Sequence, residues 1–106
     1  PIENLLVICD DIALPFGVCR VKLKGGHGGH NGLTDIIEQL NTDIFSRLRF
    51  GLGNDYPKGR QVEFVLGKWS TDEEKLIEAR IKVANDIIKS FVFSGVEQTM
   101  TNYNKK

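Results

Sequence analysis

The chain has 106 residues, of which 41% are hydrophobic and 26% are charged, a composition typical of one small globular domain. Its 14 basic residues are balanced by 14 acidic ones, which argues against nucleic-acid binding through an overall positive charge. Cys9 and Cys19 lack any CxxC or Cys/His spacing, so we expect reduced thiols, no metal site and a cytoplasmic protein. We find no signal peptide and no apolar stretch of membrane-spanning length, and we expect no membrane partner.

The first third of the chain predicts two strands. Residues 5–9, LLVIC, form a continuous apolar run that is typical of a strand covered on both faces. Residues 18–24, VCRVKLK, alternate between apolar and basic side chains, which indicates a half-buried strand. Its buried face would carry Cys19, Val21 and Leu23, and its basic outer face Arg20, Lys22 and Lys24.

A glycine-rich loop and a helix follow. Residues 24–33 read KGGHGGHNGL, and the next apolar side chains recur at helical spacing, which predicts a helix over 31–41. This apolar stripe consists of Leu33, Ile36, Ile37 and Leu40. Residues 47–53, RLRFGLG, alternate again and predict a strand with Leu48, Phe50 and Leu52 facing inward.

The last half of the chain predicts mainly helix. Residues 54–59 have the composition of a surface loop, and residues 62–66 fit either a strand or one helical turn. Residues 70–73, STDE, form a capping box, in which Ser70 caps the start of a helix and Glu73 reaches back to it. We expect this helix to run to about Phe93 and to stop at Gly95, with a short amphipathic helix after it.

This order of elements predicts an α/β fold, a partial mixed sheet flanked by helices, within one domain over residues 1–106. Three strands are few for a sheet that needs cover on both faces. The chain also begins without methionine, at PIENLLVICDD, and enters a buried strand almost at once. We therefore expect the sequence to be part of a longer domain.

The glycine loop allows three interpretations. Its amides and the start of the following helix could bind a phosphate or carboxylate, although neither GxGxxG nor GxxxxGKS/T is present. His27 and His30 could share a metal ion, but no third ligand has a convincing spacing. The loop could also be a tight connection in which Asn31 caps the helix.

Asp10 and Asp11 follow an apolar strand, where open α/β sheets place functional groups. A carboxylate there can orient an imidazole and stabilise its cation, as in hydrolytic His–Asp pairs. A plain turn at the end of the strand is the alternative interpretation.

Three stretches together resemble the bacterial peptidyl-tRNA hydrolase family. They are VICDDIALPFGVCRVKLKGGHGGHNGLTDII, FSRLRFGLG and VEFVLGKW, and GGHGGHNGL before an amphipathic helix is the most specific of the motifs. The resemblance covers essentially the whole chain and corresponds to the C-terminal portion of the family's fold. Cys9 is a departure, because the family commonly has histidine at this position.

The resemblance implies hydrolysis of the ester between a peptide and tRNA, without metal or cofactor. It implies that Asp10 orients the general base, a histidine of the N-terminal portion that this sequence lacks and that neither His27 nor His30 replaces. It also implies that Asn31 is the asparagine that contacts the substrate, and that His30, the histidine next to it, belongs to the same substrate-binding site. Lys22 and Arg49 match basic positions associated with the tRNA backbone.

The resemblance also leaves alternatives for this chain. We expect it to be inactive alone, as part of a parent enzyme that is a monomer. It could instead be a non-catalytic piece that binds tRNA or another polyanion through its basic strand. It could also be a truncated chain without activity, with a cut sheet edge that offers a route to self-association.

Overall fold

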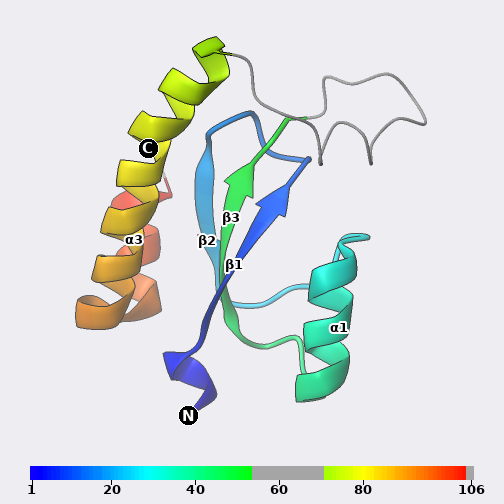
Figure 1. Cartoon of the computed structure of the whole chain (residues 1–106). Helices are drawn as coiled ribbons and strands as arrows, with labels where there is room; N and C mark the ends of the chain where they lie inside the picture. The colour runs from blue at the N-terminus through cyan, green and yellow to red at the C-terminus, as the bar shows by residue number, and fades with distance from the viewer. Residues whose placement is uncertain (54–70, 105–106) are drawn as a thin grey trace.

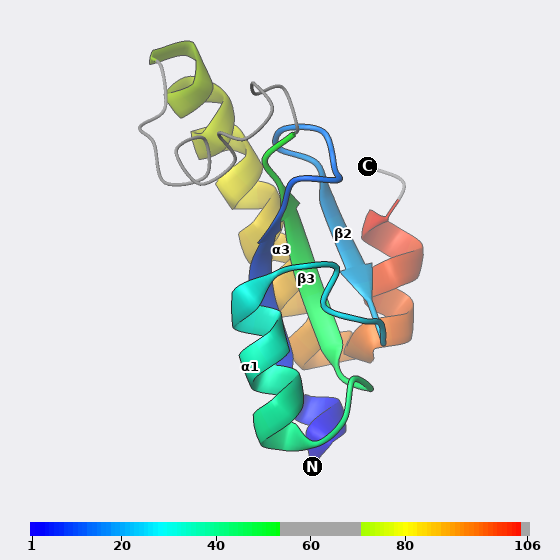
Figure 2. The ribbon, with the colours of Figure 1, turned by 90° about the vertical axis from the view of Figure 1, so that its right-hand side faces the viewer.

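The computed structural model describes residues 1–53 and 71–104 and has three layers, with helices on both faces of a sheet. Strand β1 (Leu6–Asp11), β2 (Cys19–Lys22) and β3 (Ser46–Gly51) form the sheet. Helix α1 (Asn31–Leu40) covers one face and helix α3 (Thr71–Tyr103) the other, as Figures 1 and 2 show. A short 3-10 turn, η1 (Ile2–Asn4), precedes β1. The predicted α/β class is therefore confirmed.

The sheet is mixed, with the strand order β1-β3-β2. β3 runs parallel to β1, so the chain must cross over between them, and α1 makes that crossover on one face. β3 runs antiparallel to β2. Because β3 lies in the centre, the side chain of Leu48 is fully buried.

Each face of the sheet has its own apolar core. On the α3 face, Leu48 packs with Cys19, Val21 and Ile87. On the α1 face, Cys9 packs with Leu33 and Phe45. The alternation of residues 18–22 and 46–51 thus produces two cores, because opposite sides of the same strands meet different helices.

Two details of the predicted strands are wrong. In the described sheet β1 is an edge strand, and it is not covered on both faces, since Ile8, on the same face as Leu48, is 58% exposed. β2 ends at Lys22 rather than Lys24, because the chain leaves the sheet there to form the glycine loop, and Leu23 is 40% exposed as a result.

The long C-terminal helical segment bends where the sequence predicts a stop. α3 contains one non-helical residue, Gly95, at φ 85 and ψ 172, so it consists of two helices joined by a kink. The hydroxyl of Thr99 donates to the Gly95 carbonyl at 2.8 Å and lies 2.7 Å from the hydroxyl of Ser90 across the kink. Within the described part of the chain, no helix has the length and apolar character needed to cross a membrane. The predictions for residues 54–59, 62–66 and Ser70 lie outside the described residues.

Asn104, directly after α3, pairs with the outer edge of β2 in the described sheet. Asn104 accepts a hydrogen bond from the Val21 amide at 2.7 Å and donates one to the Val21 carbonyl at 3.0 Å. A single side-chain amide thus satisfies both backbone groups that Val21 would otherwise leave unpaired at the edge.

Candidate active site and cationic sheet face

A cavity of about 600 Å³ lies between the end of β1, the arginines of β3, the glycine loop and the start of α1. Four of the five predicted site residues, Asp10, His30, Lys22 and Arg49, line it. The complete lining consists of residues 9–13, Lys22, residues 25–30, Leu33, Arg47 and Arg49. The fifth predicted residue, Asn31, is exposed next to His30 and does not line the cavity.

The glycine loop makes a tight turn just before α1. Gly28 and Gly29 have φ angles of 57° and 83°, a left-handed conformation that other side chains adopt with strain. The turn is closed by the His30 amide, which donates to the His27 carbonyl at 2.9 Å. Nδ1 of His27 accepts from the Gly29 amide at 2.9 Å. Among the described residues, no three His, Cys, Asp or Glu side chains are placed to hold a metal ion.

His30, not Asn31, caps α1. Nδ1 of His30 accepts a hydrogen bond from the Leu33 amide at 3.1 Å, and its carbonyl accepts from the Thr34 hydroxyl at 3.0 Å. The alternative in which Asn31 is the cap is therefore wrong, because Asn31 is already the first helical residue. The imidazole thus accepts from the Leu33 amide, one of the backbone amides at the start of a helix that have no partner within the helix.

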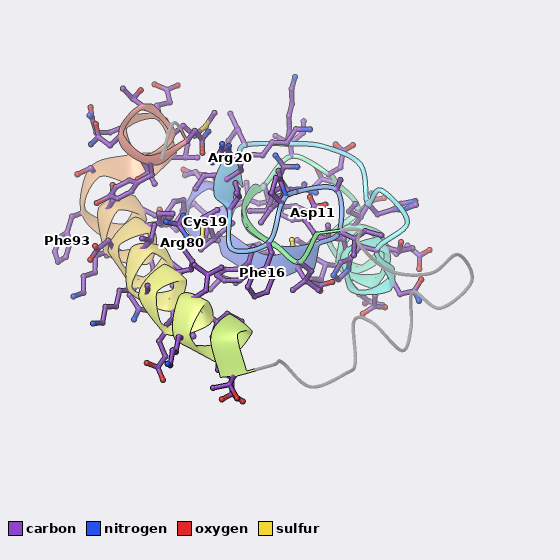
Figure 3. All side chains as sticks on the ribbon, turned by 90° about the horizontal axis from the view of Figure 1, so that it is seen from above. Asp11, Phe16, Cys19, Arg20, Arg80 and Phe93 are labelled. Atoms are coloured by element: carbon purple, nitrogen blue, oxygen red, sulfur yellow. The ribbon has the colours of Figure 1, made fainter. Side chains whose placement is uncertain are left out.

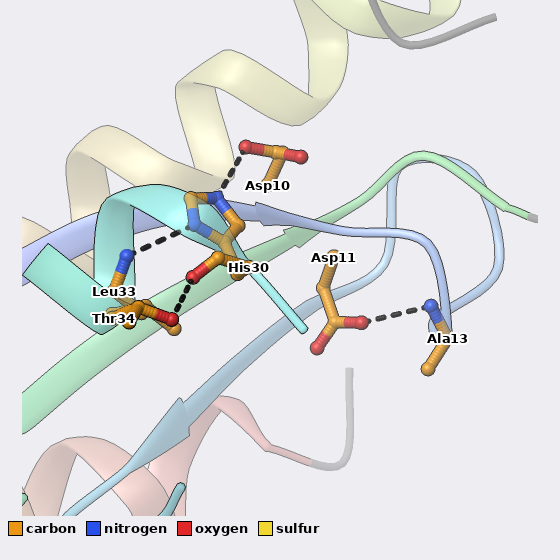
Figure 4. Close-up of polar contacts among 6 residues, drawn as sticks. All are labelled: Asp10, Asp11, Ala13, His30, Leu33 and Thr34. Atoms are coloured by element: carbon orange, nitrogen blue, oxygen red, sulfur yellow. Dashed lines mark hydrogen bonds and ion pairs between the residues drawn. The ribbon is translucent and has the colours of Figure 1, made fainter. Parts of the chain in front are cut away.

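The same imidazole contacts Asp10. Nε2 of His30 lies 2.8 Å from Oδ1 of Asp10, and Figure 4 shows the ring between the carboxylate and the Leu33 amide. Both side chains are partly exposed, at 28% for His30 and 42% for Asp10. The Asp10 carboxylate is therefore linked to the start of α1 through His30, and both side chains line the cavity.

Asp11 has a different environment from its neighbour. One carboxylate oxygen accepts from the Ala13 amide at 2.8 Å, which stabilises the turn after β1. The other accepts from Nη1 of Arg49 at 3.1 Å. Both oxygens of Asp11 are thus engaged, whereas Oδ2 of Asp10 has no recorded partner among residues 1–53 and 71–104.

The strand register gathers positive charge on the α1 face of the sheet. Lys22 lies directly opposite Arg47, and Arg20 lies opposite Arg49. Directly opposite residues share a face, and like charges placed so repel each other. The ion pair with Asp11 offsets the charge of Arg49 only, so this cationic face, defined by these four residues, attracts anions.

Arg47 is buried, which the alternating pattern of its strand does not indicate. The alternation of residues 47–53 places it on the side of the strand opposite Leu48, Phe50 and Leu52, but the residue is only 1% exposed. Its guanidinium lies 4.2 Å above the Phe45 ring and donates to the Gly26 and Asp43 carbonyls, at 3.3 and 2.8 Å. Burial lowers the pKa of this guanidinium from its ordinary value. Arg47 thus fastens the glycine loop to β3.

A second arginine, missed in the sequence, fixes the loop between β1 and β2. Nε of Arg80, on α3, donates to the Gly17 carbonyl at 2.6 Å, and Figure 3 labels Arg80 close to Cys19. Gly17 also donates to the Gly51 carbonyl at 2.8 Å. Arg80 is 63 residues from Gly17 in the sequence, so no local pattern indicates this contact.

Both cysteines are buried, and the environment of Cys9 makes it unreactive. Burial, followed by the negative charges of Asp10 and Asp11, raises the pKa of the Cys9 thiol from 9.0. Burial likewise raises the pKa of Cys19. The thiols therefore stay protonated at neutral pH, and the thiolate is the nucleophilic form.

We expect both thiols to react with iodoacetamide much more slowly in the folded chain than in urea. The unfolded state releases the protons first, so the thiols' contribution to stability is complete below the ordinary pKa of 9.0 and is lost as pH rises toward the folded-state value. Unfolding from pH 8 to 10 should therefore show a smaller loss of stability in a Cys9→Ala/Cys19→Ala variant. Rapid labelling of the native chain would contradict this.

Comparison with known proteins identifies the relatives of this chain. The family described as "Peptidyl-tRNA hydrolase" matches residues 1–106. The peptidyl-tRNA hydrolases of Phocaeicola vulgatus and Parabacteroides distasonis are 51% and 50% identical to this chain over 106 residues. The crystal structure of peptidyl-tRNA hydrolase from Acinetobacter baumannii matches 93% of this chain and 50% of its own, with a TM-score of 0.82 and 39% identity. Both curated matches extend over all 106 residues of this chain, but the chain spans only 57% of each relative's length.

Proposed function

Because the chain belongs to the peptidyl-tRNA hydrolase family, we propose that it forms part of a cytoplasmic enzyme that hydrolyses the ester between a peptide and tRNA. We assign residues 1–106 to the C-terminal portion of one domain, in an enzyme that acts as a monomer and uses no cofactor. One observation carries the proposal: Asp10, whose Oδ2 has no hydrogen-bond partner within the described residues, lies at a cavity bordered by a cationic sheet face.

The chemistry of ester hydrolysis fits the groups present. The reaction needs a positioned base, a water molecule and hydrogen-bond donors for the developing oxyanion. Asp10 orients the base histidine, which we place outside this chain, and stabilises its cation. Asn31, exposed at the start of α1, supplies an amide that donates to the substrate. His30 precedes Asn31 in the chain and contacts Asp10 through its imidazole.

The tRNA backbone would meet the cationic face. Lys22 is exposed and Arg49 is partly exposed, and both line the cavity. Cationic side chains that contact phosphates release counterions, so binding weakens as salt increases. Balanced overall charge with this local concentration favours contact with one end of a tRNA over wrapping of a long duplex.

The experiment that tests this function is a hydrolysis assay on a chimera. In the chimera, this chain replaces the 106 matching residues of the Phocaeicola vulgatus relative, and the assay follows release of peptide from peptidyl-tRNA. We expect the chimera to be active and this chain alone to be inactive. A folded chimera without hydrolysis would contradict the proposal.

A second candidate function, tRNA binding without catalysis, is supported by the cationic face. In that case the chain alone binds tRNA in low salt, Lys22→Ala weakens the binding, and the chimera does not hydrolyse. We also propose that the outer edge of β1, an edge strand of the described sheet, allows the isolated chain to self-associate. Size-exclusion chromatography over a range of concentrations tests that point.

A further inference from the structure

We propose that His30 is a positioning residue that couples the start of α1 to Asp10, an inference that rests on the proposed hydrolase function. Two hydrogen bonds on opposite sides of one ring carry it. Nδ1 lies 3.1 Å from the Leu33 amide, and Nε2 lies 2.8 Å from Oδ1 of Asp10. The ring therefore connects a backbone group of the helix to the carboxylate that orients the base.

The backbone partner determines where the imidazole proton resides. The Leu33 amide can only donate, so Nδ1 must accept and carries no proton. In the neutral ring the proton is then on Nε2, which donates to Asp10. Because the single lone pair of the ring is occupied by the amide, His30 has no acceptor left for a proton from water. The ring is thus a donor to Asp10 and not a second base.

Holding Oδ1 of Asp10 fixes the rotation of its carboxylate. Oδ2 is then the oxygen left for the base histidine, and Figure 4 shows it pointing away from the imidazole. Small displacements of such a group are costly, since about 1 Å of misplacement can lower a rate about a hundredfold. His30 therefore acts through Asp10 without contacting the reacting atoms.

Gly32 provides the space that this arrangement needs. A Cβ atom at position 32 would lie 2.9 Å from Cε1 and 3.3 Å from Nδ1 of His30. Glycine inside a helix costs about 1 kcal/mol relative to alanine. Its presence in the first turn of α1 is explained by the imidazole that lies across it.

Two substitutions separate the two hydrogen bonds. In His30→Asn, the short side-chain amide can still cap the helix through its oxygen, but it cannot reach Asp10. In His30→Gln, the longer side chain can bring its NH₂ group to Asp10, but it caps the helix poorly. His27 supplies matched controls, because its Nδ1 also accepts a backbone amide and no carboxylate contact is recorded for its Nε2 in the described structure.

In the chimera, we expect His30→Asn to lower kcat about tenfold to a hundredfold with little change in KM. We expect His30→Gln to recover most of kcat, although its urea midpoint falls. His27→Asn and His27→Gln should change kcat much less than His30→Asn does, because His27 has no carboxylate contact within the described residues. If His30 only caps the helix, the order reverses, and His30→Gln becomes the slower variant. That order would overturn the proposal.

A spectroscopic test on this chain does not depend on activity. Long-range ¹H–¹⁵N NMR at high pH should show the Nε2–H tautomer for His30, and Asp10→Ala should shift the His30 signals but not those of His27. A Nδ1–H tautomer, or His30 signals unaffected by Asp10→Ala, would refute the inference even in an active chimera. An inactive chimera with the expected spectra would refute the hydrolase proposal and leave the His30–Asp10 geometry established.

Discussion

Asp10→Asn in the chimera is expected to lower kcat by about 10²- to 10⁴-fold while KM stays close to its original value. The amide keeps the size of the carboxylate and can still accept a hydrogen bond from Nε2 of His30. It carries no negative charge, however, so it cannot stabilise the cation that forms when the base histidine takes a proton from water. Single-turnover release of peptide from peptidyl-tRNA measures this loss directly.

Asp11→Asn is the matched control. The substitution removes one charge from the adjacent position, where both carboxylate oxygens are already engaged by Ala13 and Arg49. We expect a much smaller fall in kcat than for Asp10→Asn, because Asp11 stabilises a turn and balances an arginine. If kcat fell equally in Asp10→Asn and Asp11→Asn, the effect would come from the local negative charge, and the specific role proposed for Asp10 would be contradicted.

Gly51→Ala is expected to have the largest effect on stability, a loss of about 3 kcal/mol in the free energy of unfolding. A Cβ atom at this position would overlap the backbone carbonyl oxygen of Pro15 and lie 2.9 Å from the Cβ of Leu14. The loop cannot yield easily, because it is held by hydrogen bonds from Gly17 to Gly51 and from Gly53 to Leu14, both at 2.8 Å. Urea unfolding followed by circular dichroism measures the loss.

Gly26→Ala provides the comparison for that measurement. Position 26 has no atom within 4 Å of an added Cβ and no left-handed backbone angle. We expect its free energy of unfolding to stay within about 0.5 kcal/mol of the original chain. If the two variants were equally stable, the packing of residues 14–15 against Gly51 would be different from the one described.

The fold was predicted best where side-chain periodicity is strong. The apolar stripe of residues 33–40 and the alternation of residues 47–51 indicated α1 and β3, because helices and strands present their apolar residues at different intervals. The break at Gly95 was predicted as well, since glycine readily takes the left-handed angle found there. The apolar run of β1 was misleading about burial. Such a run shows that both sides of a strand are apolar, but not whether another element covers each side, and Ile8 is 58% exposed.

The candidate site was predicted only in part. The family resemblance indicated Asp10, His30, Lys22 and Arg49, and the fold brings these four residues to one cavity. It did not indicate that His30 would replace Asn31 as the helix cap, because both residues can cap and only backbone geometry decides between them. Nor did it indicate that Arg47 would be buried, since alternation assigns a side chain to a face of the sheet but not to solvent or interior.

Local features of this protein could be predicted from the sequence: where strands and helices form and where glycine allows a tight turn. These follow from interactions between residues close together in the chain. The contacts of Arg80 with Gly17 and of Asn104 with Val21 join residues 63 and 83 positions apart, so only the packing of the folded chain brings them together. The tertiary structure also decided which oxygen of Asp10 is held by His30, because that depends on how a helix and a strand pack together.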